Sequence, residues 1–303
     1  MKKSIIIKTL VFIMMTMVTH KVSALNIIDE NDYINNMGVQ INETQLNNLR
    51  NLGFTDAEIE NMDETEFSYN KDLEGEIVAS SIKYYKTEHF IPGGSTYSIQ
   101  NNNNSLIITT EITKEEYDNC DNNTGISPYG LSTDVVVTEY KSMYSTITSV
   151  NGRYRYKNSV TWKKLPFWRT IDVIGIGIEG NKVYPVSSSS YFKAYYSDGG
   201  ASTQSGTWKK SSTGYAVTFE WPSYNLLADN FYATLYFEVD KQDSNTLTVL
   251  NAYGDYAHCQ GNCNSTASIG VSIGPDGLSI SGSISSKFDA ISTSQATLTE
   301  INW

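Results

Sequence analysis

The chain has 303 residues, of which 33 are acidic and 22 are basic, so its formal net charge at pH 7 is −11. This acidic excess argues against nucleic-acid binding, which depends on clustered lysine and arginine. A hydrophobic content of 40% is enough for a packed core and excludes a wholly disordered chain.

Residues 1–24 have the order of features found in a secretory signal peptide. Lys2 and Lys3 precede an apolar run over residues 10–18, and the small-residue cleavage sequence Val-Ser-Ala ends at Ala24. We therefore expect a secreted, extracellular protein. Cleavage would remove four lysines and no acid, which takes the net charge from −11 to −15. The apolar run is shorter than the roughly 20 residues that span a bilayer, so we predict no transmembrane anchor in the mature chain.

Residues 25–75 are predicted to form a short helical leader that docks on the body. Helical turns are expected over residues 43–70. Gly53 is a candidate C-terminal cap of the first helix, and Thr55 with Glu58 forms the capping-box pattern that opens the next. The element is too small to be stable alone, so we expect it to pack on the β-rich part of the chain.

Residues 76–303 are predicted to form a single β-rich domain, because strand signals replace the helical period. The fold class expected is mainly β, an antiparallel β-sandwich or open barrel with a small N-terminal helical element. The candidate strands are 77–87, 105–112, 134–149, 153–163, 171–178, 191–197, 214–220, 231–240, 246–258, 267–273 and 278–285.

Two turns are especially informative. Asn151-Gly152 separates two long β-prone runs and is the strongest hairpin signal in the chain. Gly274-Pro275-Asp276-Gly277 divides residues 267–285 into two arms in which apolar residues alternate with serine and glycine. Such an amphipathic hairpin is also typical of β pore-forming toxins. Each arm is nevertheless shorter than the roughly 9–11 residues of a membrane-spanning strand.

The segment Leu49-Arg50-Asn51-Leu52-Gly53-Phe54-Thr55, followed by Glu58-Ile59, Met62 and Tyr84-Tyr85-Lys86, resembles uncharacterised secreted β-rich proteins of Gram-positive bacteria. Their layout is similar: a signal peptide, a short helical leader with an LGF segment, and a β body. The resemblance is clearest over residues 45–90. The resemblance implies that this chain is secreted and has the same layout. It identifies no catalytic or binding residue.

Three cysteines remain after cleavage of the signal peptide. Cys259 and Cys263 flank a Gly-containing turn and are predicted to form a disulfide, since export permits one. A bridge from Cys120 to either of them is the alternative. No standard zinc spacing is present, so no metal site is assigned to these residues.

The most basic stretch of this acidic chain lies within residues 153–169. Strand alternation places Arg153, Arg155 and Lys157 on one face and tyrosines on the other. One interpretation is a core strand with a charged outer face. The other is a recognition face for a glycan or a cell-wall polymer, with Arg153, Arg155, Trp162 and Trp168 as its binding residues, because aromatic rings stack on sugars and arginine binds anions.

Oxygen-bearing side chains crowd residues 115–125, and Ca²⁺ prefers oxygen ligands, but the spacing does not match an EF-hand. We therefore expect no cofactor and keep Ca²⁺ as the alternative for this loop.

No catalytic motif is present. The mature chain keeps two histidines, His89 and His258, and no serine has the G-x-S-x-G context. The sequence therefore favours a secreted, non-catalytic binding or surface-interaction protein. The alternatives are a β pore-forming toxin that uses the 267–285 hairpin and a secreted hydrolase without a readable motif.

Overall fold

A computed structural model gives the fold of the protein. It describes residues 33–91, 106–120, 127–128, 135–163, 166, 168–197, 202–222, 230–242, 247–261, 263, 269–282, 285–291 and 293–301. The predicted signal peptide and residues 121–125 of the candidate Ca²⁺ loop lie outside these ranges. Among the helices that fall within them, none is both long and apolar enough to cross a membrane.

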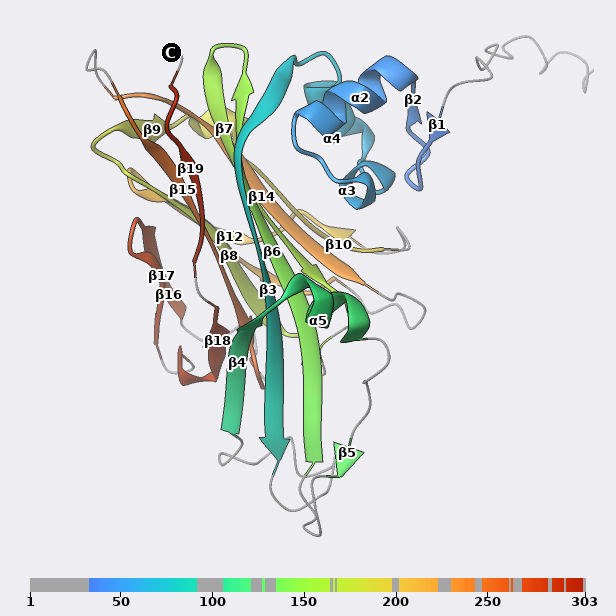
Figure 1. The fold of residues 1–303 in the computed structure, drawn as a ribbon, viewed down its shortest axis with the longest axis vertical. Coiled ribbons are helices and arrows are strands. Elements are labelled where there is room, and N and C mark those ends of the chain that lie inside the picture. The colour runs from blue at the N-terminus through green and yellow to red at the C-terminus, as the bar shows by residue number, and fades with distance from the viewer. Residues whose placement is uncertain are drawn as a thin grey trace, which may run out of the picture.

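Two antiparallel sheets pack face to face, which confirms the predicted mainly β class and makes it sandwich-like rather than a closed barrel (Figure 1). The larger sheet has nine strands and the smaller has six. In spatial order the larger sheet contains β11 (Ser202–Thr203), β10 (Tyr191–Tyr196), β14 (Phe231–Lys241), β7 (Arg153–Trp162), β6 (Val135–Val150), β3 (Gly75–Ile91) and β4 (Leu106–Ile112), with β5 (Ser127–Pro128) on β6 and β9 (Val183–Pro185) on β14. The smaller sheet contains β12 (Thr207–Ser211), β13 (Gly214–Glu220), β8 (Ile171–Ile178), β15 (Leu250–Cys259) and β18 (Phe288–Ala290), with β19 (Ser294–Leu298) on β15.

The hairpin signal at residues 151–152 is confirmed. β6 and β7 pair in register from Lys141 opposite Trp162 to Val150 opposite Arg153. Asn151 and Gly152 have φ angles of 48° and 80°, the left-handed conformation that a two-residue hairpin turn requires. This turn fixes the register, and the register in turn decides which side chains of β7 enter the core.

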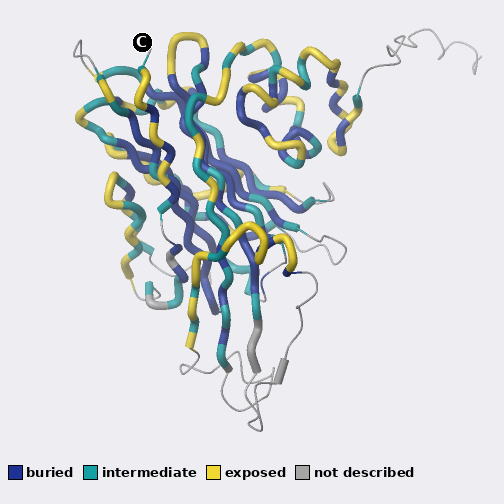
Figure 2. Tube along the Cα trace, in the orientation of Figure 1, coloured by how far each residue is buried: buried dark blue, intermediate teal, exposed yellow. Residues whose placement is uncertain are grey.

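The main core lies between the two sheets, where Figure 2 shows the strands almost wholly buried. The larger sheet contributes Tyr156, Trp162 and Phe237, and the smaller contributes Ile174 and Tyr256. Aromatic rings supply much of this apolar contact, which accounts for the high tyrosine content.

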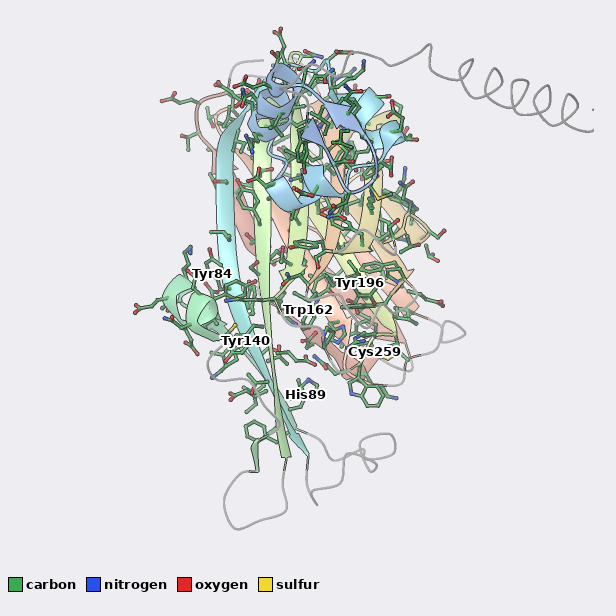
Figure 3. All side chains as sticks on the ribbon, turned by 90° about the vertical axis from the view of Figure 1, so that its right-hand side faces the viewer. Tyr84, His89, Tyr140, Trp162, Tyr196 and Cys259 are labelled. Carbon is green, nitrogen blue, oxygen red and sulfur yellow. A yellow bond between two sulfur atoms is a disulfide. The ribbon has the colours of Figure 1, made fainter. Side chains whose placement is uncertain are left out.

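One buried ion pair joins the two sheets, and a second buried pair lies within the smaller sheet. Lys141 Nζ on β6 lies 2.5 Å from Asp289 Oδ2 on β18, and both side chains are at most 2% exposed. His258 Nδ1 lies 2.7 Å from Asp172 Oδ1. Burial lowers the pKa of His258, but the Asp172 carboxylate, together with the charges of Asp289 and Glu139, raises it more, so the net shift is upward. The Trp162 ring lies between these pairs, with its centroid 4.6 Å from Lys141 Nζ and 4.8 Å from that of the His258 ring. Figure 3 shows Trp162 and, lower in the view, His89.

The 267–285 segment contains the hairpin of β16 (Ile269–Gly274) and β17 (Gly277–Gly282), which pair with each other and not with either large sheet. Its Ile273 packs with Val173 and Ala216 on the outer face of the six-stranded sheet. A β-carbon added at Gly177 would lie 2.0 Å from the Gly274 carbonyl oxygen, so this sheet position accommodates the hairpin only as glycine. Each arm has six residues, and membrane insertion of this hairpin stays a prediction.

The predicted disulfide between Cys259 and Cys263 is present, and the alternative bridge to Cys120 is not formed. Cys120 is buried elsewhere, in a cluster with Tyr117 and Tyr140 next to helix α5 (Lys114–Asp118). Figure 3 shows Tyr140 beside this helix. The last short elements are the β1 (Tyr33–Ile34) and β2 (Gln40–Ile41) pair and the 3-10 turns η4 (Ser187–Ser189) and η5 (Ser285–Lys287).

Candidate functional site

The N-terminal helical element, defined here as residues 33–74, lies against the outer face of the nine-stranded sheet (Figure 1). Its helices are α2 (Glu43–Asn51), α3 (Asp56–Glu60) and α4 (Glu64–Asn70). The predicted capping box of Thr55 and Glu58 is present. Gly53 follows α2 with a φ of 87°, as expected of a C-terminal cap.

Glu58 is held by three side chains of the sheet in addition to its capping contacts. Its Oε2 lies 2.6 Å from Lys157 Nζ on β7. Its Oε1 accepts hydrogen bonds from Ser159 Oγ at 2.7 Å and Thr234 Oγ1 at 2.8 Å. Burial raises the pKa of Glu58, but the Lys157 ammonium and these hydrogen bonds lower it more, so the net shift is downward. We call Lys157, Ser159 and Thr234 the carboxylate socket.

A second group of contacts fixes α4. Lys193 Nζ on β10 lies 3.2 Å from Asp63 Oδ2 and 2.5 Å from the Asn61 carbonyl oxygen. Arg155 donates to Asn70 Oδ1 at 2.7 Å and lies 3.2 Å from Glu238 Oε1. The docking of the helices therefore depends largely on buried polar contacts.

A pocket opens where α4 meets the sheet and the η4 turn. It has a volume of about 170 Å³ and is formed by three chain segments: α4, residues 188–191 and strand β14. Its lining consists of tyrosines, hydroxyl side chains and one carboxyl group: Thr65, Glu66, Tyr69, Ser188, Ser189, Ser190, Tyr191 and Tyr236.

Stacked tyrosines form one wall of the pocket. Tyr191 and Tyr236 are directly opposite each other on β10 and β14, and their ring centroids are 5.1 Å apart with planes 20° from parallel. The Arg155 guanidinium lies 4.9 Å from the Tyr236 ring centroid and 5.9 Å from that of Tyr69. Tyr69 is 45% exposed, so its ring is available to a ligand.

Hydroxyl groups and a buried carboxyl form the rest of the pocket. Ser189 Oγ accepts from the Glu238 amide at 2.8 Å, and Lys210 Nζ donates to Ser190 Oγ at 2.7 Å. Tyr191 donates its hydroxyl proton to Glu66 Oε2 at 3.0 Å. These contacts hold the polar groups at fixed positions before any ligand binds.

Glu66 holds its proton unusually tightly. Burial raises the pKa of the Glu66 carboxyl, and Lys193 and the Tyr191 hydroxyl oppose this rise. The net effect is an increase of the pKa from 4.5 to about 7. A raised carboxyl pKa gives stability that is complete below pH 4.5 and is lost as the pH rises through 7.

The variant Glu66→Gln tests this pH dependence, because glutamine resembles the protonated carboxyl. We expect the unfolding free energy of Glu66→Gln to fall less between about pH 5 and pH 8 than that of the wild type, by roughly 2–3 kcal/mol. Urea unfolding of both proteins at the two pH values measures this, and parallel pH profiles would contradict it.

The structure separates the residues predicted to form one recognition face. The predicted alternation of β7 holds, but Trp162 is completely buried in the core between the sheets and Arg155 is buried beneath the helices. Arg153 stays 44% exposed and pairs with Glu238 and Asp240, so it lies close to Arg155. Trp168 is half-buried and comes after the end of β7. A single exposed face of these four residues is therefore not formed, because the helical element and the second sheet cover opposite sides of β7.

Sequence reasoning did not find the pocket. Residues 187–190 have the composition of an exposed loop, and nothing marks Tyr69, Tyr191 and Tyr236 among 21 tyrosines. The pairing of β10 with β14 is what brings two of them together.

The pocket contributes a single carboxyl group, Glu66, so it does not provide the carboxylate pair of a glycosidase. Within the described residues, no group of three or more histidine, cysteine or acidic side chains could hold a metal ion.

No protein-family model matches the chain, and no curated protein matches its sequence. Three solved structures show a weak likeness. The pilus backbone protein RrgB of Streptococcus pneumoniae is 6% identical, with a TM-score of 0.27 over 50% of this chain and 43% of that one. The major pilin SpaD of Corynebacterium diphtheriae is 7% identical, with a TM-score of 0.28 over 71% and 74% of the two chains. The N-terminal domain of the Streptococcus gordonii adhesin Sgo0707 is 12% identical, with a TM-score of 0.28 over 74% and 56%. The chain thus spans less than half of the first of these proteins, and likenesses this weak indicate no function.

Proposed function

We propose that the protein is a secreted, non-catalytic binding protein that recognises one sugar ring of a glycan in the pocket between α4, η4 and β10. The observation that carries the proposal is the combination of stacked tyrosines with serine hydroxyls in one small hollow. A sugar has apolar C–H faces and a rim of hydroxyl groups. Tyrosine rings suit the faces, and serine hydroxyls, which both donate and accept hydrogen bonds, suit the rim.

The size of the pocket supports a small ligand group. Its volume of about 170 Å³ is below the roughly 300–1,000 Å³ of sites that enclose drug-sized molecules. A terminal or branching sugar ring is of the appropriate size, whereas an extended polymer would have to lie across the surface. Export, which the features of residues 1–24 predict, would bring the pocket to extracellular glycans.

Tyr69→Ala is the most direct test of this function. We expect the wild-type chain to bind selected members of a glycan array, and Tyr69→Ala to lose at least about tenfold in affinity for them, since one aromatic anchor contributes on the order of 1–3 kcal/mol. Isothermal titration with the glycan identified on the array gives the affinity.

Tyr184→Ala is the matched control, because Tyr184 on β9 is 42% exposed and lies outside the pocket lining. It should bind as the wild type does. Absence of any glycan ligand, or equal affinity of Tyr69→Ala and wild type, would reject the proposal.

A further inference from the structure

The helical element is an acidic module that packs mostly on itself. Residues 33–74 contain nine acidic and two basic residues, a net charge of −7. Eight of the ten buried members of its apolar cluster belong to the element, and the sheet supplies only Val150 and Tyr236. The element therefore resembles a small partner bound to the sheet more than a layer of the same core.

The sheet face beneath it is built to receive carboxylates. Three cationic side chains, Arg155, Lys157 and Lys193, are each at most 2% exposed and point toward the element. In the carboxylate socket, one ammonium and two hydroxyl donors converge on the single carboxylate of Glu58. Lys157 also donates to the Gly53 carbonyl oxygen, so the socket recognises both the side chain and the backbone of the element.

The element is joined to the body by one short connection. Four residues, Lys71 to Glu74, separate the end of α4 from the start of β3 (Figure 1). All contacts between the element and the sheet could therefore be made equally well by an element that belongs to another molecule. Because the contacts are identical, the difference in free energy between the two arrangements is limited to the connection and to the entropy of association.

We propose that this interface also forms between two copies of the chain, with the helical element of each copy occupying the carboxylate socket of the other. The occupant is determined by charge and shape: an acidic segment that presents Glu58, Asp63 and the carbonyl of Gly53 in the required geometry. The exchange would produce a dimer with two pockets, because α4 carries Glu66 and Tyr69 with it.

Charge reversal provides a stringent test. In the Lys157→Glu variant, Glu58 of the element faces a second carboxylate at position 157 of its own sheet. In the Glu58→Lys variant, the new lysine of the element faces the ammonium of Lys157. Neither variant can dock its own element well. In a mixture of the two full-length variants, exchange restores an opposite-charge pair at both interfaces. At one interface the Glu58 element meets the Lys157 socket, and at the other the two reversed residues face each other as lysine and glutamate.

We expect each variant alone to run as a monomer in size-exclusion chromatography with light scattering, and the mixture to give a species of twice the mass. Mixing Lys157→Glu with Glu43→Lys, which reverses an exposed residue of α2, should leave the mass unchanged. A mixture that stays monomeric although circular dichroism shows both variants to be folded would overturn the proposal.

A second measurement covers the case in which a variant fails to fold. Light and isotopically heavy wild-type chains are mixed, exposed briefly to about pH 3 to protonate the carboxylates that hold the element, and returned to neutral pH. Native mass spectrometry should then detect dimers of mixed mass. Finding only monomers after this treatment would overturn the proposal independently of the variants.

Discussion

Replacing Lys141 by methionine should destabilise the folded protein by about 3–5 kcal/mol, because it leaves the Asp289 carboxylate buried without its cation. The Asp289 side chain is 2% exposed, and its Oδ2 accepts from Lys141 Nζ at 2.5 Å. Its hydrogen-bond donors Gln260 Nε2 and the His258 amide, both at 2.9 Å, are neutral and do not supply this charge. The residues come from different sheets, so the loss acts on the contact between the two layers.

Urea unfolding followed by tryptophan fluorescence measures this effect, since the Trp162 ring centroid lies 4.6 Å from Lys141 Nζ. The double variant Lys141→Met/Asp289→Asn should recover a large part of the loss, because it removes both charges and keeps an acceptor for the His258 amide. Lys83→Met breaks the more exposed pair with Glu111 and should cost less than about 1 kcal/mol. Equal costs for Lys141→Met and Lys83→Met would contradict the role of the buried pair.

Local patterns in the sequence predict the strands well. The segments 171–178 and 214–220 coincide with β8 and β13, because their β-prone composition and flanking glycines are visible without knowledge of partners. The Asn151-Gly152 turn is equally local. The short edge strands β11, β12, β18 and β19 carry too few residues to show a period, and their pairing is set by the neighbouring strand.

The sites depend on contacts that no local pattern contains. The alternation of side chains along β7 correctly places Arg155 and Lys157 on the face opposite the core. A charged strand face in turn predicts that these two side chains are exposed to solvent. The helical element reverses that conclusion by covering both side chains with its own carboxylate and amide groups. The pocket is likewise created by the meeting of α4, η4 and β10, which are brought together by the tertiary fold.

Glu58→Ala should destabilise the docking of the helical element by about 3–5 kcal/mol, an effect as large as that of Lys141→Met. The change leaves the Lys157 ammonium, which is 1% exposed, without its carboxylate partner. It also removes the carboxylate that accepts hydrogen bonds from the hydroxyls of Ser159 and Thr234. It also removes the Glu58 half of the capping box of α3, while the Thr55 side chain still accepts from the backbone amide of residue 58. The shift of the Glu58 pKa is downward, so this stabilisation is present above pH 4.5 and is lost as the pH falls through the lowered pKa.

The location of the loss distinguishes this prediction from general destabilisation. Because the element has its own apolar cluster and few apolar contacts with the sheet, Glu58→Ala should speed hydrogen exchange in α3 and α4 far more than in β8 or β15. Glu43→Ala, which removes an exposed acid from the first turn of α2, should change stability by no more than about 0.5 kcal/mol. Uniform acceleration of exchange in both sheets and helices would mean that Glu58 supports the whole fold rather than the docking of one module.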